Sequence, residues 1–319
     1  MRVKIAVTLG DPAGVGPELA ARVCHDEEVL AQADIVIVGQ KKLLAGGARA
    51  AGLSFPQVTL KECGPVARTD PGQPSAAGGA QAGAFIRQAA LMCLSGEVQA
   101  MTTAPVSKEY LNLAGYRYAG HTEMLAELAG GAKAVMMMAG PLLKVSLLST
   151  HVPLRRAEEF IRPENIDYTC RTTWQWLNRY WGYENPRLAV AAFNPHAGEN
   201  GLLGREEQNL IRPAVEALAG EGMDIKGPLA ADALFWRVLK YGEFDAVVCM
   251  YHDQGLIPFK MIHFEDGVNV SLGLPFIRTS PDHGTAFDLA GQGRADGGSM
   301  KAAVLLAAHM ARRNPAGPR

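Results

Sequence analysis

Short apolar runs alternate along this chain with longer segments that have the spacing of amphipathic helices. The apolar runs are rich in Val, Ile, Ala and Leu, and they cover residues 3–9, 34–38, 98–103, 143–149, 188–193 and 244–250. The helical patterns cover residues 17–30, 80–94, 166–181, 206–219 and 230–241. Because strands that alternate with helices pair in parallel, the pattern predicts an α/β fold with a mostly parallel, doubly wound sheet.

Composition excludes several classes of protein. With 48% apolar and 20% charged residues in 319, the chain has the make-up of a globular protein with a sizeable core. The 31 basic and 32 acidic residues nearly cancel, so no global field recruits nucleic acid or an anionic membrane surface. The longest apolar stretch, residues 134–148, is interrupted by Gly140, Pro141 and Lys144, which argues against a membrane span.

The cysteines, the glycine-rich region and the ends of the chain give further expectations. Five dispersed cysteines without a CxxC pair fit neither a disulfide framework nor a thiolate zinc site, and with no export signal they indicate a reducing cytoplasm. Residues 64–83 are dense in Gly and Pro and are expected to form a loop or hairpin. We expect one enzyme unit over residues 1–319, with 312–319 as a frayed tail.

Three of the eight histidines stand just past the end of an apolar run: His151, His196 and His252. Ligands bind in the crevice outside the carboxyl ends of parallel strands, so these imidazoles are expected to converge there. Three neutral imidazoles and an open position make a catalytic divalent-metal site, although each histidine alone could simply satisfy a turn. Zinc, magnesium, manganese and cobalt all remain open as the metal.

Cationic side chains follow the third of these histidines. Lys260, Asn269 and Arg278 are expected within one strand-loop-strand segment, where the Arg fork and the Lys point charge suit a phosphate or a carboxylate. His121 and Thr122 open a helix, whose N-terminal turn also favours an anion.

Two glycine-containing loops are candidates for binding a dinucleotide. The segment from Gly10 to Gly16 follows a strand but lacks the GxGxxG spacing, so it does not predict a Rossmann site. The better candidate is the loop of residues 283–291, HGTAFDLAG, which resembles the HGSAPDIAG loop by which β-decarboxylating hydroxyacid dehydrogenases hold their cofactor. We therefore assign cofactor binding to five residues of this loop, namely His283, Gly284, Thr285, Asp288 and Gly291.

Taken in order, the motifs GDPAGVGPE, TAPVSK, GHTE, STHVPL, NPHAGE, ADALF, YHDQGL, GLPFIRTS and DHGTAFDLAG resemble those of the 4-hydroxythreonine-4-phosphate dehydrogenase family. The resemblance implies a two-lobed α/β/α subunit like that of isocitrate and isopropylmalate dehydrogenases. It also implies a homodimer with its active site near the interface, and NAD (or NADP) as oxidant. The family's metal ligands fall on His151, His196 and His252, and its substrate-binding residues fall on His121, Thr122, Lys260, Asn269 and Arg278.

The implied reaction is metal-assisted oxidation of 4-phosphohydroxy-L-threonine and decarboxylation to 3-amino-1-hydroxyacetone 1-phosphate, in pyridoxine phosphate biosynthesis. Asp253, Asp232 and Lys108 are candidates for catalytic roles, and the general base stays unassigned. Related enzymes oxidise four-carbon sugar-acid phosphates or a terephthalate cis-dihydrodiol, so these substrates stay open. Alternatives of another class are a metal-dependent hydrolase or lyase without NAD, and a non-catalytic or acyl-transferring relative.

Overall fold

The computed structural model describes residues 2–118 and 121–314, with the side chain of Thr122 also outside the description. The chain divides into two compact units. Unit 1 comprises Met1–Ala134 and Glu265–Arg319, and unit 2 comprises Val135–Phe264. Unit 1 is therefore built from the two ends of the sequence, and unit 2 is the segment between them.

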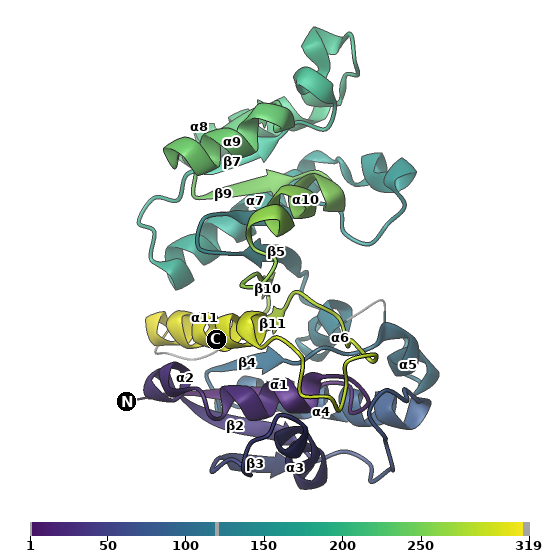
Figure 1. Ribbon diagram of the computed structural model, residues 1–319. Coiled ribbons are helices and arrows are strands. Elements are labelled where there is room, and N and C mark those ends of the chain that lie inside the picture. Colours follow the sequence, from purple (N-terminus) through teal and green to yellow (C-terminus); the bar gives the residue numbers. More distant parts are fainter. Residues whose placement is uncertain (1, 119–120, 315–319) are drawn as a thin grey trace. The chain divides into compact units, whose positions relative to one another are not determined.

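Unit 1 contains a mostly parallel sheet in the order β3-β2-β1-β4-β11-β10. Figure 1 labels β3, β2, β4, β11 and β10 of this sheet. Its strands are β1 (Val3–Thr8), β2 (Ala33–Gly39), β3 (Thr59–Glu62), β4 (Ala100–Thr103), β10 (Val268–Leu272) and β11 (Ile277–Pro281). Four of the pairings are parallel, and only β10 runs antiparallel, to β11. The carboxyl ends of β1, β4 and β11 consequently share one edge of this sheet.

Helices cover the sheet of unit 1. They are α1 (Gly16–Val23), α2 (Glu27–Gln32), α3 (Lys41–Ala50), α4 (Ala76–Leu94), α5 (Lys108–Leu113), α6 (His121–Leu128) and α11 (Gly298–Arg313). Both α11 and α4 pack against β1 and β4. The strand residues between them, such as Ile5, Val7 and Met101, are fully buried and form the core of the unit.

Unit 2 repeats this architecture with the strand order β5-β6-β9-β7-β8. The strands are β5 (Val135–Ala139), β6 (Lys144–Leu147), β7 (Leu188–Ala191), β8 (Ile225–Leu229) and β9 (Ala246–Cys249). Here β6, β9, β7 and β8 are parallel, and β5 runs antiparallel to β6.

Alternate side chains of these strands face two layers of helices. The helices are α7 (Pro163–Trp176), α8 (Arg212–Gly220), α9 (Ala231–Tyr241) and α10 (His252–Ile262), with short turns η1 (Leu154–Phe160), η2 (Leu177–Trp181), η3 (Pro195–Gly201) and η4 (Glu207–Ile211). Val145 and Leu147 of β6 pack into a core with Leu234 of α9 and Phe259 of α10. Ser146, between them, accepts a hydrogen bond from Thr173 of α7 at 2.8 Å, so α7 lies on the opposite face.

The structure confirms all six predicted strands and corrects several other expectations. The helix predicted over residues 17–30 is two helices, because the Asp26 carboxylate accepts a hydrogen bond from Val29 N at 3.0 Å and starts α2. Part of the glycine-rich 64–83 region is helical, since α4 begins at Ala76. A Cβ at Gly79 would lie 2.0 Å from Tyr110 O, so only a glycine at this position lets α5 pack closely against α4. This packing outweighs the low helix propensity of glycine.

The largest correction concerns residues 251–278, which were expected to form a strand, a loop and a strand. Helix α10 begins at His252 and continues through Pro258, so Lys260 lies on a helix. Leu256 and Phe259 bury in the core of unit 2, and that packing compensates for the proline in the helix interior. At the other end of the chain α11 continues to Arg313, so part of the segment expected to fray is helical, and residues 315–319 lie outside the description.

Neither disulfides nor membrane spans are found in the described residues. All five cysteines are free, and four of them are buried. Burial raises the pKa of the Cys24 and Cys170 thiols to about 12, so these side chains stay protonated and pack as small apolar groups. Within residues 2–118 and 121–314, the structure has no helix with the length and apolar character that crossing a membrane requires.

Candidate active site

The three histidines expected to bind a metal follow three neighbouring parallel strands of unit 2. Strand β9 lies between β6 and β7 and is parallel to both. His151 follows β6, His252 follows β9 and His196 follows β7, so all three stand at the carboxyl edge of the same sheet. The strand-end placement deduced from the sequence is therefore correct.

Two side chains connect these three strand ends by hydrogen bonds. Ser149 Oγ donates to Met250 O at 2.9 Å, which ties the end of β6 to the end of β9. Gln254 accepts from Met250 N at 2.7 Å and donates to Ala192 O at 2.6 Å, which ties β9 to β7. Both side chains are buried, so the edge that carries the histidines is fixed by contacts within unit 2.

Two of the histidines lie close together. The ring centroids of His151 and His252 are 5.7 Å apart, and both rings line a hollow of about 240 Å³ together with Asp253. The Asp253 carboxylate lies 2.7 Å from His252 Nδ1. When Nδ1 donates its proton to this carboxylate, the Nε2 lone pair is left for a metal ion, which is a common arrangement of a metal-binding histidine and its partner.

His196 is held differently. It lies on η3, where the five residues from His196 to Asn200 all have positive φ angles, between 44° and 75°. The residue before η3 is anchored by Glu207, whose carboxylate accepts from Phe193 N at 2.8 Å and from Asn194 N at 2.7 Å. The only ionisable partner found for His196 in the described residues is Glu199, at 4.0 Å.

No group of three His, Cys, Asp or Glu side chains placed to hold a metal ion is found in the described part of the chain. The structure thus brings His151 and His252 together, and His196 is not among the described residues that line their hollow. Imidazole donors with a carboxylate behind one of them suit zinc, cobalt or manganese, so the donor types fit a divalent ion. The three-histidine ligand set stays a prediction.

A buried arginine dominates the anion-binding candidates of unit 1. Arg278, on β11, is 2% exposed. Its Nε and one Nη donate to Thr103 Oγ1 at 3.1 and 2.7 Å, and the other Nη donates to Asn269 and Ser271 at 3.2 and 3.1 Å. Burial lowers the pKa of Arg278 to about 10, so the side chain is still charged at neutral pH.

His121 lies in the same environment, at the start of α6. Its Nε2 atom is buried and has no hydrogen-bond partner among residues 2–118 and 121–314. Burial holds the pKa of His121 well below its usual range, and the charges of Arg278 and Lys108 lower it further. No ion pair between the Arg278 guanidinium and a carboxylate is found in the described residues, although the charge of Glu123 acts on Arg278 and raises its pKa. This imbalance of charge suits an anionic ligand.

The remaining predicted residues lie at several places. Asn269 is on β10 and contacts Arg278, and Lys108 is the first residue of α5, capped by Ser107. In unit 2, Lys260 Nζ lies 5.9 Å from the ring centroid of Phe264, and Asp232 is exposed in the first turn of α9. The side chain of Thr122 lies outside the described residues.

The predicted cofactor loop is an irregular segment between β11 and α11. His283, Gly284, Asp288 and Gly291 are exposed, whereas Thr285 is half-buried. His283 Nδ1 lies 3.0 Å from Gly284 O, and Gln292 donates to Asp288 O at 2.5 Å. The exposed side of the loop is accessible to a ligand.

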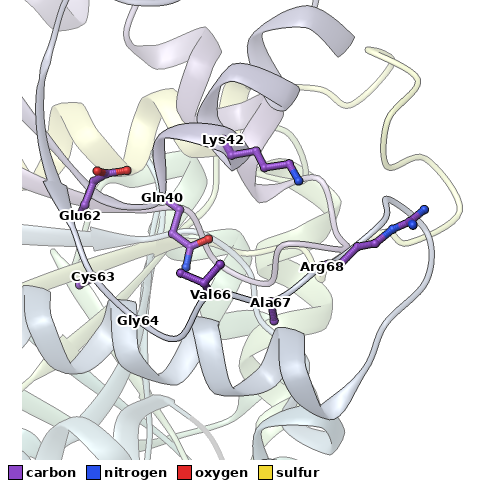
Figure 2. Close-up of a pocket in the computed structure, with 8 residues that line it drawn as sticks. All are labelled: Gln40, Lys42, Glu62, Cys63, Gly64, Val66, Ala67 and Arg68. Carbon is purple, nitrogen blue, oxygen red and sulfur yellow. The ribbon is translucent and has the colours of Figure 1, made fainter.

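A separate pocket of about 530 Å³ lies beyond the carboxyl ends of β2 and β3 (Figure 2). Several polar groups on its rim bind other parts of the protein. Gln40 donates to Pro65 O at 2.7 Å, Glu62 accepts from Lys41 N at 3.0 Å, and Arg68 contacts Asp70 at 3.2 Å. None of the residues predicted from the sequence to form the site is among the described residues that line this pocket.

Comparison with known proteins decides the family. Residues 24–307 match the family model described as pyridoxal phosphate biosynthetic protein PdxA. This chain belongs to the PdxA family. A 4-hydroxythreonine-4-phosphate dehydrogenase of Geobacter metallireducens is 48% identical, over 97% of this chain and 96% of the relative. The chain is therefore an enzyme of the dehydrogenase class, in a family of pyridoxal phosphate biosynthesis.

Solved structures of relatives have the same fold as this chain. The crystal structure of 4-hydroxythreonine-4-phosphate dehydrogenase from Klebsiella pneumoniae superposes with a TM-score of 0.86 at 40% identity, and the match covers 98% of both chains. A terephthalate 1,2-cis-dihydrodiol dehydrogenase from Burkholderia xenovorans is more distant, with a TM-score of 0.69 and 28% identity over 97% of this chain and 98% of that one. These matches confirm the predicted mostly parallel α/β architecture.

Five residues that shape the site were absent from the predicted set: Thr103, Ser149, Ser271, Glu207 and Gln254. Thr103 and Gln254 lie within motifs that pointed to the family, TAPVSK and YHDQGL, but both look like ordinary polar positions there. Their roles depend on contacts with distant segments, since Thr103 and Arg278 are 175 positions apart. Ser271 and Glu207 lie in none of these motifs, so no signal in the sequence pointed to them.

Proposed function

We propose that this PdxA-family chain catalyses the NAD-linked, metal-dependent oxidation of 4-phosphohydroxy-L-threonine, followed by decarboxylation to 3-amino-1-hydroxyacetone 1-phosphate. The observation that supports this most directly is the buried charge of Arg278, whose hydrogen-bond partners are hydroxyl and amide oxygens, beside the neutral His121. A buried guanidinium whose partners are hydroxyl and amide oxygens is costly without a ligand. A phosphate would offset that cost with charge-assisted hydrogen bonds.

The residues of unit 1 would bind the anionic end of the substrate. Arg278 is oriented by Thr103, Asn269 and Ser271. The unpartnered Nε2 of His121 offers a donor to a phosphate oxygen when its tautomer carries the proton on Nε2. Lys108 adds positive charge at the end of the same sheet. A fixed site of this kind positions the substrate before the reaction begins, which is a large part of what such an enzyme contributes.

The histidines at the strand ends of unit 2 would form the metal site. His151, His196 and His252 would hold the divalent ion, with Asp253 orienting His252 through the 2.7 Å contact. The ion supplies Lewis acidity that lowers the pKa of the substrate hydroxyl. NAD would lie on the exposed face of the loop formed by residues 283–291, as the resemblance to the β-decarboxylating dehydrogenases implies.

A panel of substrates tests the proposed reaction. With NAD and a divalent metal, kcat/KM for 4-phosphohydroxy-L-threonine is expected to exceed that for unphosphorylated hydroxythreonine by at least about 10²-fold, because loss of a buried charge-assisted contact costs about 3 kcal/mol or more. The measurement is NADH formation at matched metal concentration. Higher kcat/KM for a four-carbon sugar-acid phosphate or for the terephthalate dihydrodiol would replace the proposed substrate, and turnover without NADH formation would favour the hydrolase or lyase alternative.

We also propose that the chain forms a homodimer through unit 2. Ile257 and Met261 lie one turn apart on α10 and are 60% and 82% exposed, and Phe264 just beyond the helix is 76% exposed. Adjacent large apolar side chains on a surface favour burial against a partner. This surface supports the dimer that the family resemblance implies.

Replacing Met261 with glutamate is expected to raise the dimer dissociation constant at least about tenfold, because a charge would be buried without a partner. Sedimentation velocity over a range of protein concentrations measures this. The matched control is Leu113→Glu on unit 1, at a position 63% exposed, which should leave the dimer unchanged. A monomeric wild-type chain, or a Met261 variant that dimerises normally, would contradict the proposal.

A further inference from the structure

The segment from Gly10 to Glu18, GDPAGVGPE, joins β1 to α1 and has no part in the proposed reaction so far. Its backbone contacts the predicted cofactor loop. Val15 N donates to Thr285 O at 3.0 Å, and a Cβ on Gly14 would lie 2.7 Å from the same oxygen. Gly14 therefore allows a close approach that a larger residue would prevent. The turn therefore lies against the predicted cofactor loop, and the Val15 amide donates its hydrogen bond to that loop.

A buried glutamate holds the far end of the same loop. Glu18, on α1, is 2% exposed, and its two carboxylate oxygens accept from Gly291 N and, at 2.9 Å, from Gly293 N. One turn later on the helix, Arg22 donates to Gly293 O at 2.7 Å. Hydrogen bonds from backbone amides to a buried carboxylate are charge-assisted, and without the carboxylate both amides would lack these acceptors.

The loop needs such support because part of its backbone is unfavourable. Ala286 has a φ of 42°, in the left-handed region that a residue with a side chain adopts only where its surroundings hold it there. Phe287 also packs edge-on against Tyr110 of α5, with ring centroids 6.1 Å apart. The contacts of α1 and α5 therefore set the shape of a loop whose opposite side, with His283 and Asp288, is exposed.

We infer that Glu18 is a positioning residue for the dinucleotide: it holds the loop of residues 283–293 in the shape that binds NAD, without touching NAD itself. The inference rests on the proposed assignment of this loop to the cofactor. It gives the GDPAGVGPE motif a role that differs from that of a glycine-rich phosphate loop. A loop that is already ordered loses less entropy on binding, so Glu18 would act on cofactor affinity and not on the chemical step.

The test is Glu18→Gln, which keeps the size of the side chain but removes its charge and one of its acceptor oxygens. The KM for NAD is expected to rise about tenfold or more, with kcat at saturating NAD changed less than about twofold. Hydrogen exchange of residues 283–293 should become faster, while exchange in β1 and β4 stays slow. A residue that only stabilised the fold would not separate KM for NAD from kcat in this way.

Asp26→Asn is the matched control in the same unit. Asp26 accepts from Val29 N at 3.0 Å and pairs with Lys301 at 2.9 Å, so the variant also loses a structural carboxylate. Its KM for NAD should remain at the wild-type value. A similar rise in the control would show that general destabilisation is the cause and would overturn the inference.

Asp288→Ala, on the exposed side of the loop, distinguishes a failure of the role inferred for Glu18 from a failure of the proposed assignment of this loop to NAD. If Asp288→Ala raises KM for NAD and Glu18→Gln does not, the role of Glu18 is wrong and the cofactor loop stands. If neither variant changes KM although exchange of the loop accelerates in Glu18→Gln, the cofactor assignment itself is wrong. Should Glu18→Gln fail to fold, Arg22→Gln removes the neighbouring contact to Gly293, and an unchanged KM for NAD in that variant overturns the inference.

Discussion

Replacing His196 with alanine is expected to lower kcat/KM by at least about 10³-fold, equivalent to about 4 kcal/mol of transition-state stabilisation, and to lower the metal content of the purified protein. The reason is that a three-ligand site that loses one imidazole holds its ion weakly. Metal analysis, with kcat/KM measured at several concentrations of added zinc, cobalt or manganese, checks both parts. His151→Ala and His252→Ala should behave alike.

The control for this result is His25→Ala. His25 Nδ1 lies 2.9 Å from Ala21 O, so this histidine satisfies a turn, and its loss should cost about 1 kcal/mol of stability with no change in activity or metal content. His196 is the decisive position of the three, because the ring contact found among them in the described residues joins His151 and His252. Wild-type turnover and metal content in His196→Ala would remove it from the ligand set.

The histidines were predictable because the placement of each depends only on where a strand ends. Each follows a run of apolar residues long enough to be recognised as a buried strand, and parallel strands place their carboxyl ends at one edge. The pattern could not show that β9 lies between β6 and β7, nor that Gln254 and Ser149 tie the three strand ends together. Those contacts join segments far apart in the sequence, and no local spacing encodes them.

The course of the chain after His252 was harder to predict for a local reason. Gly255 and Pro258 both disfavour a helix, so a loop was expected where α10 forms. Burial outweighs these propensities, since Leu256 and Phe259 complete the core of unit 2, and a Cβ at Gly255 would lie 3.0 Å from the Leu147 side chain. Tertiary packing therefore overrides the local preference, and Lys260 lies on a helix instead of in the predicted loop.

For GDPAGVGPE the sequence predicted only which role the motif does not have. The spacing of its glycines excluded a Rossmann turn, but nothing in the sequence linked Glu18 with Gly291 and Gly293. Buried carboxylates that bind backbone amides of a distant loop carry no spacing signal, because the loop can come from anywhere in the chain. The same holds for Glu207, which anchors the backbone just before His196.

The second large effect is expected at Arg278. Arg278→Lys keeps the charge but loses the planar fork that Thr103, Asn269 and Ser271 orient, and Arg278→Met loses both. With 4-phosphohydroxy-L-threonine we expect kcat/KM to fall about 10²-fold for Lys and at least about 10³-fold for Met, which corresponds to about 3 and 4 kcal/mol.

Comparing substrates shows which anion Arg278 binds. If it holds the phosphate, the loss caused by Arg278→Met should almost vanish with unphosphorylated hydroxythreonine, because the contact is already absent from that complex. An equally large loss with both substrates would assign Arg278 to the substrate carboxylate and would remove the main support for a phosphorylated substrate. Arg187→Met is the control, because it breaks a partly exposed ion pair with Asp245 at 2.7 Å. It should leave kcat/KM unchanged with either substrate.

Stability gives an independent measurement of the same idea. A buried cation opposes folding when no carboxylate forms an ion pair with it, and none is found for Arg278 in the described residues. Its replacement by an apolar side chain of similar length should therefore cost little when no ligand is present. For Arg278→Met without substrate we therefore expect the free energy of unfolding to change by less than about 1 kcal/mol, although four hydrogen bonds are lost. Phosphate-containing substrate should stabilise the wild type against unfolding and leave the variant unaffected, since only a binding-competent native state gains from the ligand. A loss of several kcal/mol without ligand would show that Arg278 supports the fold, and its charge would then be no argument for an anionic substrate.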